Sequence, residues 1–528
     1  MINVCAGFPL PYSLHGSLNV KNIVIPACQT PRCRSSNSDR LNVIAKFLTS
    51  CQIPRIRQRK SETPVMEYQT FKFSIPPTAL LEHFKDEPYV FLLESSLRDP
   101  ERGRYSFLGF DPFEVVVLDD ARSWERLKRN FSQCFSGKEG RRSPFSCGIM
   151  GYLGYDMGLS WENIVSRHVR DGRVPPGLFG FYDTVLTIDH KTDSLLICSS
   201  GLPERNAFLR KKRARARLKK VAGRLEQLEP FAIAPNFSSD SRQPGILKSN
   251  FTAGGYCRAV KKTLDHIRRG DIYQLNVAQR FCFEGKRECD AVSLYKTLSR
   301  LSPSSSGGYF DGGDFQIVSS SPELFLRVRG DHVETRPMKG TRPRGKSKAE
   351  DAKRRRELAN SPKEKAELLM IADLERNDLG RVCRYGSVKV RAMRTLEKYR
   401  TVFQATATIA GRLQADKDCF DVLRACFPGG SVTGCPKIRA MRIIDELEPD
   451  PRGIYTGAMG YMNFSGDMEF NVLIRTLLAR REKIYFHVGS GIVADSVPRR
   501  EYEETLVKAR AMRECVTCRA ADRAPEPA

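Results

Sequence analysis

Two pairs of glutamates stand at a spacing that suits metal binding. Each has the form Glu-x-x-Glu, Glu364 with Glu367 and Glu501 with Glu504, inside segments whose pattern predicts helices. Residues three apart share one helix face, so each pair directs two carboxylates to the same side. Four carboxylates without cysteine or histidine partners suit a hard cation such as Mg²⁺. From spacing alone, the alternative is a pair of solvated helix surfaces.

Glycine-rich turns supply a second chemical signal. They occur at 429–434, 489–491 and 337–341, and such turns can present backbone N–H groups to anions. Lys339 lies in the turn Pro-Met-Lys-Gly-Thr. If it is desolvated there, its pKa falls toward neutrality and the neutral amine becomes a nucleophile. A solvated lysine is the ordinary alternative.

Other familiar signatures are absent from the sequence. It contains no P-loop, no G-x-G-x-x-G after a strand, no H-E-x-x-H, no G-x-S-x-G and no kinase motif set. Cys515 and Cys518 form a lone C-x-x-C without a second pair at zinc-ribbon spacing. The 16 cysteines are too sparse for a secreted disulfide scaffold, so we interpret them as reduced intracellular thiols.

Hydrophobic patterning predicts the elements that position these residues. Short strands at 89–93, 113–117 and 184–188 indicate a mostly antiparallel sheet in an N-terminal region, 66–233. A Pro/Ser/Asn-rich linker, 234–250, leads to a second region, 251–515, which carries the four glutamates, and a tail follows at 516–528. Predicted helices are 203–229, 256–269, 348–360, 363–374, 436–447 and 500–513. Their irregular alternation with strands favours an α+β fold with antiparallel sheets.

Composition bounds the function classes. With 41% apolar and 28% charged residues the chain is globular, and no apolar run reaches the roughly 20 residues of a membrane-spanning helix. The 87 basic and 61 acidic residues give a net charge of +26, and ten Lys/Arg lie between 205 and 224. Nucleic-acid binding is therefore an alternative function, although stacking aromatics and known nucleic-acid modules are missing and a solvated basic face explains the charge equally.

The first 65 residues have the composition of a basic extension. Nine Lys/Arg and one acid, Asp39, occur in the first 60 residues, without clear periodicity. Three interpretations remain open: an organelle transit segment, a disordered extension, or a start assigned too early with Met66 as the true beginning. The corresponding expectation for location is cytoplasmic, or organellar if the extension is a transit segment.

Six segments taken together resemble the chorismate-utilising enzymes, which include anthranilate, aminodeoxychorismate, isochorismate and salicylate synthases. They occur in family order between about Glu67 and Met512: GDIYQLNVAQRF (270–281), SSSPELFLRV (319–328), RPMKGTRPRG (336–345), ELLMIADLERNDLGRV (367–382), FPGGSVTGCPKIRAM (427–441) and GSGIVADS (489–496). The resemblance implies that family's large fold, a sandwich of antiparallel β-sheets with helices packed outside.

The resemblance also implies a site. Glu367 and Glu504 would be direct Mg²⁺ ligands, with Glu364 and Glu501 as outer or water-bridged partners. Tyr455 and Arg475 match residues that hold the enolpyruvyl carboxylate of chorismate. The remaining substrate-binding candidates are Gln274, Gly340, Thr341, Gly489, Gly491 and Lys508.

Two positions indicate a branch of the family. Gln274 stands where isochorismate and salicylate synthases carry a lysine that activates water, which disfavours water as the nucleophile. Lys339 gives the P-M-K-G-T form typical of aminodeoxychorismate synthase component I, whereas anthranilate synthases usually have alanine there. The resemblance thus implies that Lys339 adds to chorismate and that Glu323 acts as general acid, which requires a raised carboxyl pKa. Anthranilate synthase component I remains the alternative.

Three further features concern regulation and partners. The stretch 302–307 lacks the N-P-S-P-Y-M-like turn of tryptophan-controlled anthranilate synthases, yet Ser95 matches a serine that contacts tryptophan in several relatives. Gln404 replaces a histidine found in many relatives. Because the chain has no G-x-C-x-G nucleophile loop, we expect a separate glutamine amidotransferase subunit to supply the ammonia.

Overall fold

The structure is a computed structural model that describes residues 66–72, 75–97, 103–135, 142–169, 174–228, 245–285, 290–399 and 402–517. The predicted basic extension, most of the predicted linker, and Cys518 with the rest of the tail lie outside these residues. No helix in the described ranges has the length and apolar character that crossing a membrane requires.

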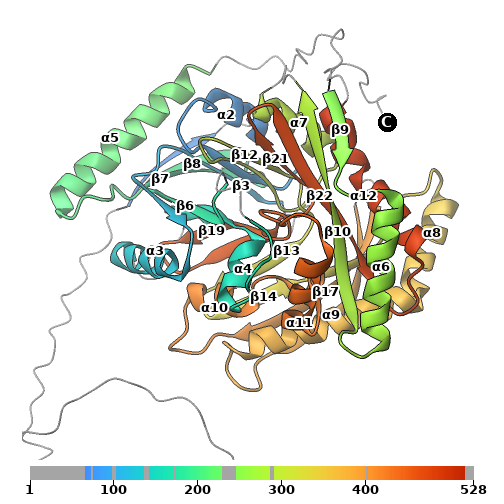
Figure 1. Ribbon diagram of the computed structural model, residues 1–528. Helices are drawn as coiled ribbons and strands as arrows, with labels where there is room; N and C mark the ends of the chain where they lie inside the picture. Colours follow the sequence, from blue (N-terminus) through green and yellow to red (C-terminus); the bar gives the residue numbers. More distant parts are fainter. Residues whose placement is uncertain are drawn as a thin grey trace, which may run out of the picture. The chain divides into compact units, whose positions relative to one another are not determined.

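Twelve strands form the first sheet (Figure 1). Their order is β1-β8-β7-β3-β2-β11-β12-β21-β22-β10-β18, and β9 also pairs with β10. Because β2 pairs with β11, the sheet joins strands from both predicted regions. The bounds are β1 Glu67–Lys72, β2 Phe91–Glu94, β3 Tyr105–Gly109, β7 Thr184–Asp189, β8 Ser194–Ser199, β9 Gly245–Ser249, β10 Gln274–Gly285, β11 Gly307–Asp311, β12 Gln316–Ser319, β18 Gly434–Cys435, β21 Thr476–Arg480 and β22 Lys483–Ile492.

Ten strands form the second sheet, in the order β15-β17-β14-β13-β20-β19-β5-β6-β4, with β16 also pairing with β17. Neighbouring strands are antiparallel, as for β10 with β22 in the first sheet and β19 with β5 here. The bounds are β4 Glu114–Leu118, β5 Gly148–Leu153, β6 Gly177–Tyr182, β13 Leu324–Arg329, β14 His332–Arg336, β15 Met338–Pro343, β16 Lys389–Lys398, β17 Val402–Arg412, β19 Ala458–Asn463 and β20 Met468–Val472.

Eleven α-helices lie in the described residues. They are α2 Pro77–His83, α3 Ala121–Cys134, α4 Tyr155–Trp161, α5 Ala207–Glu226, α6 Ala253–Arg268, α7 Ala291–Leu301, α8 Lys348–Asn360, α9 Pro362–Gly380, α10 Cys419–Cys426, α11 Lys437–Leu447 and α12 Pro498–Thr517. Local sequence explains where α9 begins: Ser361 accepts a hydrogen bond from the backbone of Glu364, and Pro362 occupies the first turn.

The core shows how the layers pack. Aromatic side chains from both sheets, including Phe107 of the first and Tyr152 of the second, form one buried cluster between them. Outside it, α5, α7 and α12 pack on the first sheet, and α3, α9 and α10 pack on the second (Figure 1). This arrangement confirms the predicted α+β sandwich with helices outside.

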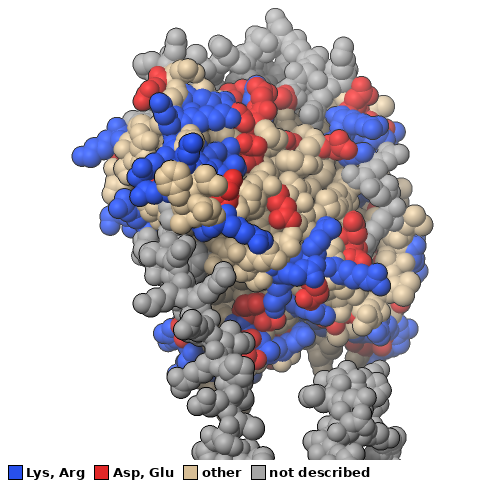
Figure 2. Space-filling model, turned by 90° about the vertical axis from the view of Figure 1, so that its left-hand side faces the viewer, with Lys and Arg blue, Asp and Glu red and all other residues tan. Residues whose placement is uncertain are grey.

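The basic segment predicted as a helix forms α5. Figure 2 shows lysines and arginines gathered on this side of the molecule, with acidic residues among them. Several of the α5 cations are paired within the chain: Arg213 and Arg217 contact Asp183, and Arg224 contacts Glu87. Part of the positive charge is therefore used to attach the helix to the sheet below it.

Candidate active site

Lys339 lies near the start of β15, and its ammonium group reaches the facing ends of β10 and β22. A Cβ atom on Gly491 would lie 3.2 Å from Lys339 Nζ and 3.0 Å from Gln274 Nε2, so this glycine leaves the space that both side chains use. Burial lowers the pKa of Lys339 below its ordinary value, against the opposing field of Glu367. The structure therefore gives the predicted nucleophile the desolvated setting that the chemistry needs.

Glu323 immediately precedes β13 and is 4% exposed. The hydroxyl of Ser431 donates a hydrogen bond to Glu323 Oε1 at 2.6 Å. Burial raises the pKa of Glu323 to about 7, although this hydrogen bond and the charge of Lys339 both lower it. A carboxyl group with a pKa near neutrality can hold a proton and donate it, as a general acid must.

Three of the four predicted metal-site glutamates meet where α9 faces α12. Lys363 Nζ lies 3.9 Å from Glu367 Oε1 on its own helix and 3.5 Å from Glu501 Oε1 on α12, so the two glutamates face a common cation. Glu504 pairs with Lys508 one turn along α12, at 2.8 Å. The predicted convergence of the two Glu-x-x-Glu pairs is therefore seen for these three residues.

Glu364 lies apart from that group, under the turn of β15. Arg342 Nη1 donates to its Oε1 at 2.7 Å, while its Oε2 is buried without a hydrogen-bond partner in the described residues. Gly340 has a φ of +81°, and a Cβ there would lie 2.9 Å from the Glu364 carboxyl carbon. Only glycine fits this turn without strain, and the turn aims Lys339 inward.

The electrostatics of the glutamates suit a hard cation. Burial raises the pKa of Glu367, and the charges of Glu504 and Glu501 raise it further. Burial also raises the pKa of Glu504, but Lys508 outweighs it and the net shift is downward. As placed in the described ranges, no three His, Cys, Asp or Glu side chains stand close enough to hold a metal. The three that meet, Glu367, Glu501 and Glu504, are nonetheless all carboxylates, and both others raise the pKa of Glu367, so these residues fit Mg²⁺ in chemistry.

Tyr455 and Lys508 meet at Gly489 of β22. A Cβ on Gly489 would lie 2.9 Å from the Tyr455 hydroxyl, and Lys508 Nζ donates to the Gly489 carbonyl at 3.0 Å. The Tyr455 ring stacks on His487 with 5.0 Å between centroids. Three predicted substrate-binding residues are thus brought together beside Gly491 and Lys339.

Arg475 precedes β21 with a φ of +50°. Burial lowers the pKa of this guanidinium, and no ion pair with a carboxylate is found for it among the described residues. Its nearest polar contact is a long one, 3.5 Å from Nη1 to Ser302 Oγ. Arg475 is half-buried, and a partly desolvated cation without a counter-charge is costly, so this arginine has the character of a group that receives an anionic ligand.

Several buried amides around Lys339 also lack protein partners. The side-chain oxygens of Gln274, Asn276 and Gln404 are buried without a hydrogen bond in the described part of the chain. Gln404 lies opposite Thr341 in the pairing of β17 with β15, although Thr341 itself is exposed. Unsatisfied buried acceptors at one place indicate that a polar ligand completes them.

Ser95 belongs to a different place. It lines a cavity of about 60 Å³ between the sheets, together with Glu94, Tyr461 and Asn471. The Ser95 hydroxyl donates to the carbonyl of Leu97 at 2.6 Å. No residue of the Lys339 group lines this cavity, so any ligand of Ser95 would bind apart from the candidate active site.

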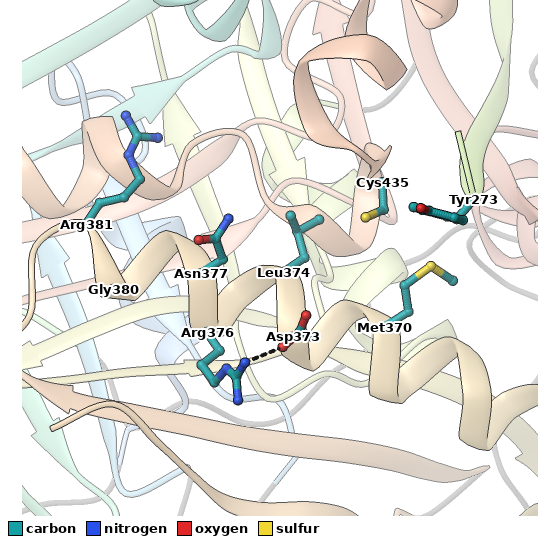
Figure 3. Close-up of a pocket in the computed structure, with 9 residues that line it drawn as sticks. All are labelled: Tyr273, Met370, Asp373, Leu374, Arg376, Asn377, Gly380, Arg381 and Cys435. Atoms are coloured by element: carbon teal, nitrogen blue, oxygen red, sulfur yellow. Dashed lines mark ion pairs between the residues drawn. The ribbon is translucent and has the colours of Figure 1, made fainter. Parts of the chain in front are cut away.

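A larger surface concavity, about 950 Å³, follows the outer side of α9 (Figure 3). Its lining includes Tyr273, Cys435 and the ion pair of Asp373 with Arg376, at 2.8 Å. None of the predicted site residues lines it. Leu374 lines this concavity and, like the next residue, Glu375, is buried.

Three residues beside the site were missed by the sequence reasoning: Ser431, Asn276 and Glu375. A signal existed for Glu375, because it follows Leu368, Ile371 and Ala372 at helical spacing and so falls on the buried face of α9. Ser431 and Asn276 stand in segments considered only for their backbone or their resemblance, and no spacing marks their side chains.

Comparison with known proteins shows which family the chain resembles. Residues 90–514 match the family described as chorismate binding enzyme. The chain is 36% identical to aminodeoxychorismate synthase component 1 of Bacillus subtilis, over 80% of this chain and 90% of that protein. It is 35% identical to anthranilate synthase component 1 of Acetivibrio thermocellus, over 83% and 92%. The crystal structure of anthranilate synthase component I from Streptococcus pneumoniae has a TM-score of 0.69, 30% identity, and coverage of 78% and 92%.

Proposed function

Because this chain belongs to the chorismate-binding enzymes, we propose that it is an aminodeoxychorismate synthase component I, which converts chorismate and ammonia to 4-amino-4-deoxychorismate. The observation that carries the proposal is the pairing of Lys339, with a lowered pKa, and Glu323, with a pKa of about 7. The reaction requires an amine nucleophile and a protonated acid, and the lowered pKa of Lys339 and the raised pKa of Glu323 shift both groups toward those forms.

The first step joins the lysine to the substrate. The lone pair of Lys339 Nζ attacks ring carbon 2, both conjugated ring double bonds shift by one position, and the 4-hydroxyl leaves from the far end of the diene. Glu323 gives its proton to that hydroxyl, which departs as water. The lysine nitrogen then carries a proton in excess, and the Glu323 carboxylate can accept it.

The second step reverses the first with a different nucleophile. Ammonia attacks ring carbon 4, both double bonds return to their original positions, and the bond from carbon 2 to Lys339 breaks. The surplus proton of the new ammonium group on carbon 4 passes to the departing lysine nitrogen. The enolpyruvyl group is kept. The net reaction exchanges one hydroxyl for one amino group and releases one water, so a separate lyase is needed to reach 4-aminobenzoate for folate.

The other site residues bind and orient. Arg475 and Tyr455 would hold the enolpyruvyl carboxylate, which would give the half-buried guanidinium its counter-charge. Glu367 and Glu504 would hold Mg²⁺, with Glu364 and Glu501 outside them, and the bound ion would neutralise the ring carboxylate. Gln274, Asn276 and the backbone of Gly340, Gly489 and Gly491 offer polar groups to the rest of the substrate.

The test is the identity of the product. The purified chain is incubated with chorismate, Mg²⁺ and ammonium salt, and the product is identified by mass with and without an added aminodeoxychorismate lyase. We expect a product that retains the pyruvyl carbons and yields 4-aminobenzoate only with the lyase. Anthranilate formed without the lyase would refute the proposal.

Anthranilate synthase component I is the second candidate. It is favoured by the near-equal identity, 35%, to a relative of that name. Lys339 weighs against it, because alanine is usual at this position in those enzymes. We further propose that a separate glutamine amidotransferase delivers the ammonia, as the component numbering in the relatives' names suggests.

A further inference from the structure

Glu375 has no role in the proposed mechanism, but it contacts the same loop, residues 429–433, as the general acid Glu323. Glu375 lies in α9 and is 2% exposed. The backbone N–H of Gly430 donates to Glu375 Oε1 at 2.9 Å, and the next residue, Ser431, donates to Glu323 Oε1 at 2.6 Å. Two buried carboxyl groups are therefore attached to consecutive residues of the loop 429–433.

The loop lies directly against α9 at this point. A Cβ atom on Gly430 would lie 2.7 Å from Leu374 Cδ2 and 3.2 Å from Glu375 Oε1, so only glycine allows this approach. With no side chain at residue 430, the hydrogen bond to Glu375 is what ties its backbone to the helix. The position of the Ser431 hydroxyl then depends on that tie.

The surroundings of Glu375 disfavour its ionised form. Burial and then the charge of Asp378 raise its pKa to about 8; Lys437 and the Gly430 N–H lower it, and Glu323 raises it. Asp378 in turn pairs with Lys437 at 2.5 Å. The upward shift of this pKa reduces the negative charge that Glu375 places near Glu323. Its Oε2 is buried and has no hydrogen-bond partner in the described residues.

We propose that Glu375 is a positioning residue for the reaction: it holds Gly430 against α9 so that the Ser431 hydroxyl fixes the Glu323 carboxyl in its catalytic orientation. The inference rests on the proposed function only in the role given to Glu323. It assigns Glu375 no contact with substrate.

The test is a double-mutant cycle of Glu375→Leu with Ser431→Ala. Leucine keeps the volume and removes the acceptor, and Glu375→Ala serves as a second variant. We expect each single change to lower kcat roughly 10- to 100-fold with little change in the KM for chorismate. The double variant should be no worse than the worse single variant, because both act through one hydrogen bond. Glu375→Gln, which keeps a neutral acceptor for Gly430, should restore kcat to within about threefold.

The pH profile provides a readout that a merely structural role would not move. The hydrogen bond from Ser431 stabilises ionised Glu323, so its loss should raise the pKa of Glu323. In both single variants the decline of kcat on the alkaline side of the pH profile should therefore move to higher pH. Asp467→Ala is the matched control, since Asp467 is a buried acid that also accepts a glycine N–H, from Gly330 at 2.9 Å, outside the site. In this control variant kcat should decline at the same pH as in the wild type.

Three results would overturn the inference: additive losses in the cycle, an unshifted alkaline limb, or a Glu375→Gln variant as impaired as Glu375→Leu. Infrared titration of the protonated Glu323 band, assigned with Glu323→Gln, measures the same shift without turnover. It therefore decides the inference even if the wild-type chain fails to make 4-amino-4-deoxychorismate, which would refute the proposed function alone.

Discussion

At the scale of single residues, burial acts in opposite directions on an amine and an acid. It lowers the pKa of Lys339 and raises the pKa of Glu323 to about 7. In water these two groups would both be ionised at neutral pH. Here both move toward their neutral forms, so the electron pair and the proton that the reaction needs can be present at the same time.

Lys339→Ala tests the nucleophile. The change removes the amine but leaves the carboxylate-binding residues in place, so we expect chorismate still to bind while kcat falls by several orders of magnitude. Intact-protein mass spectrometry of wild type with chorismate and no ammonia should show an adduct of chorismate minus water, located on the peptide that contains Lys339. Lys346→Ala, an exposed lysine a few residues along the chain, is the control and should keep both adduct and rate.

Glu323→Gln tests the acid through pH. The raised pKa means that the acid is protonated below about pH 7 and loses its proton above it, so kcat of the wild type should fall above that pH. The measurement holds the concentration of free ammonia constant, because the free-base fraction itself rises with pH. Glutamine cannot donate the proton, and we expect a loss of roughly 10²- to 10⁴-fold and no alkaline limb from this group. A wild-type profile that stays flat to pH 9 would contradict the assignment.

At the scale of elements, α9 shows what the sequence could and could not specify. Its predicted start, residue 363, is one residue after the observed start at Pro362, but its predicted end, residue 374, falls six residues before the observed end at Gly380. The polar run Glu-Arg-Asn-Asp resembles the end of a helix. The helix continues because Gly430 and Lys437, far along the chain, satisfy the buried acids Glu375 and Asp378. Partners distant in sequence cannot be deduced from local patterning.

The faces of α9 and α12 predict dependence on a divalent cation. We expect Glu367→Ala and Glu504→Ala to abolish turnover and to remain folded, since each lies on a helix face that water can reach when the carboxylate is removed. EDTA should inactivate the wild type, and added Mg²⁺ should restore it. Glu503→Ala, on the exposed side of α12 where it pairs with Arg499, should have little effect. Full activity of the wild type in EDTA would show that the reaction needs no divalent cation and would contradict this prediction.

The turn at the start of β15 predicts a stability difference between two glycines. Gly340 and Gly330 both have positive φ, +81° and +65°, but a Cβ would meet the Glu364 carboxyl only at Gly340, and at Gly330 nothing lies within 4 Å. Gly330→Ala therefore measures backbone strain alone, about 1 kcal/mol, and Gly340→Ala adds crowding to it. Thermal unfolding should show a larger loss for Gly340→Ala, together with lost activity. Equal losses would show that Glu364 moves aside freely.

At the scale of the whole molecule, long-range strand pairing sets the limit of prediction from sequence. Six helices and three strands were predicted, and apart from the end of α9 their bounds were within a few residues of those observed, while the resemblance supplied the sandwich. Five described helices, α2, α3, α4, α7 and α10, were not predicted. The sequence divided the chain at a linker, yet β2 pairs with β11 across that boundary, and β9 forms from the last residues of the predicted linker. Lys339 of one sheet and Gln274 of the other likewise meet only because the two sheets come together.

The chain as a whole should use ammonia but not glutamine. A glutaminase needs a cysteine thiolate, and every described cysteine whose pKa departs from its ordinary value is shifted upward, chiefly by burial, as Cys383 is to about 11. With ammonium salt at mildly alkaline pH we expect product, because free ammonia is then abundant. With amide-¹⁵N-labelled glutamine the pure protein should give no labelled product, and adding a glutamine amidotransferase should make the label appear. Labelled product from the pure chain would reveal a glutaminase within it and would contradict the two-component proposal.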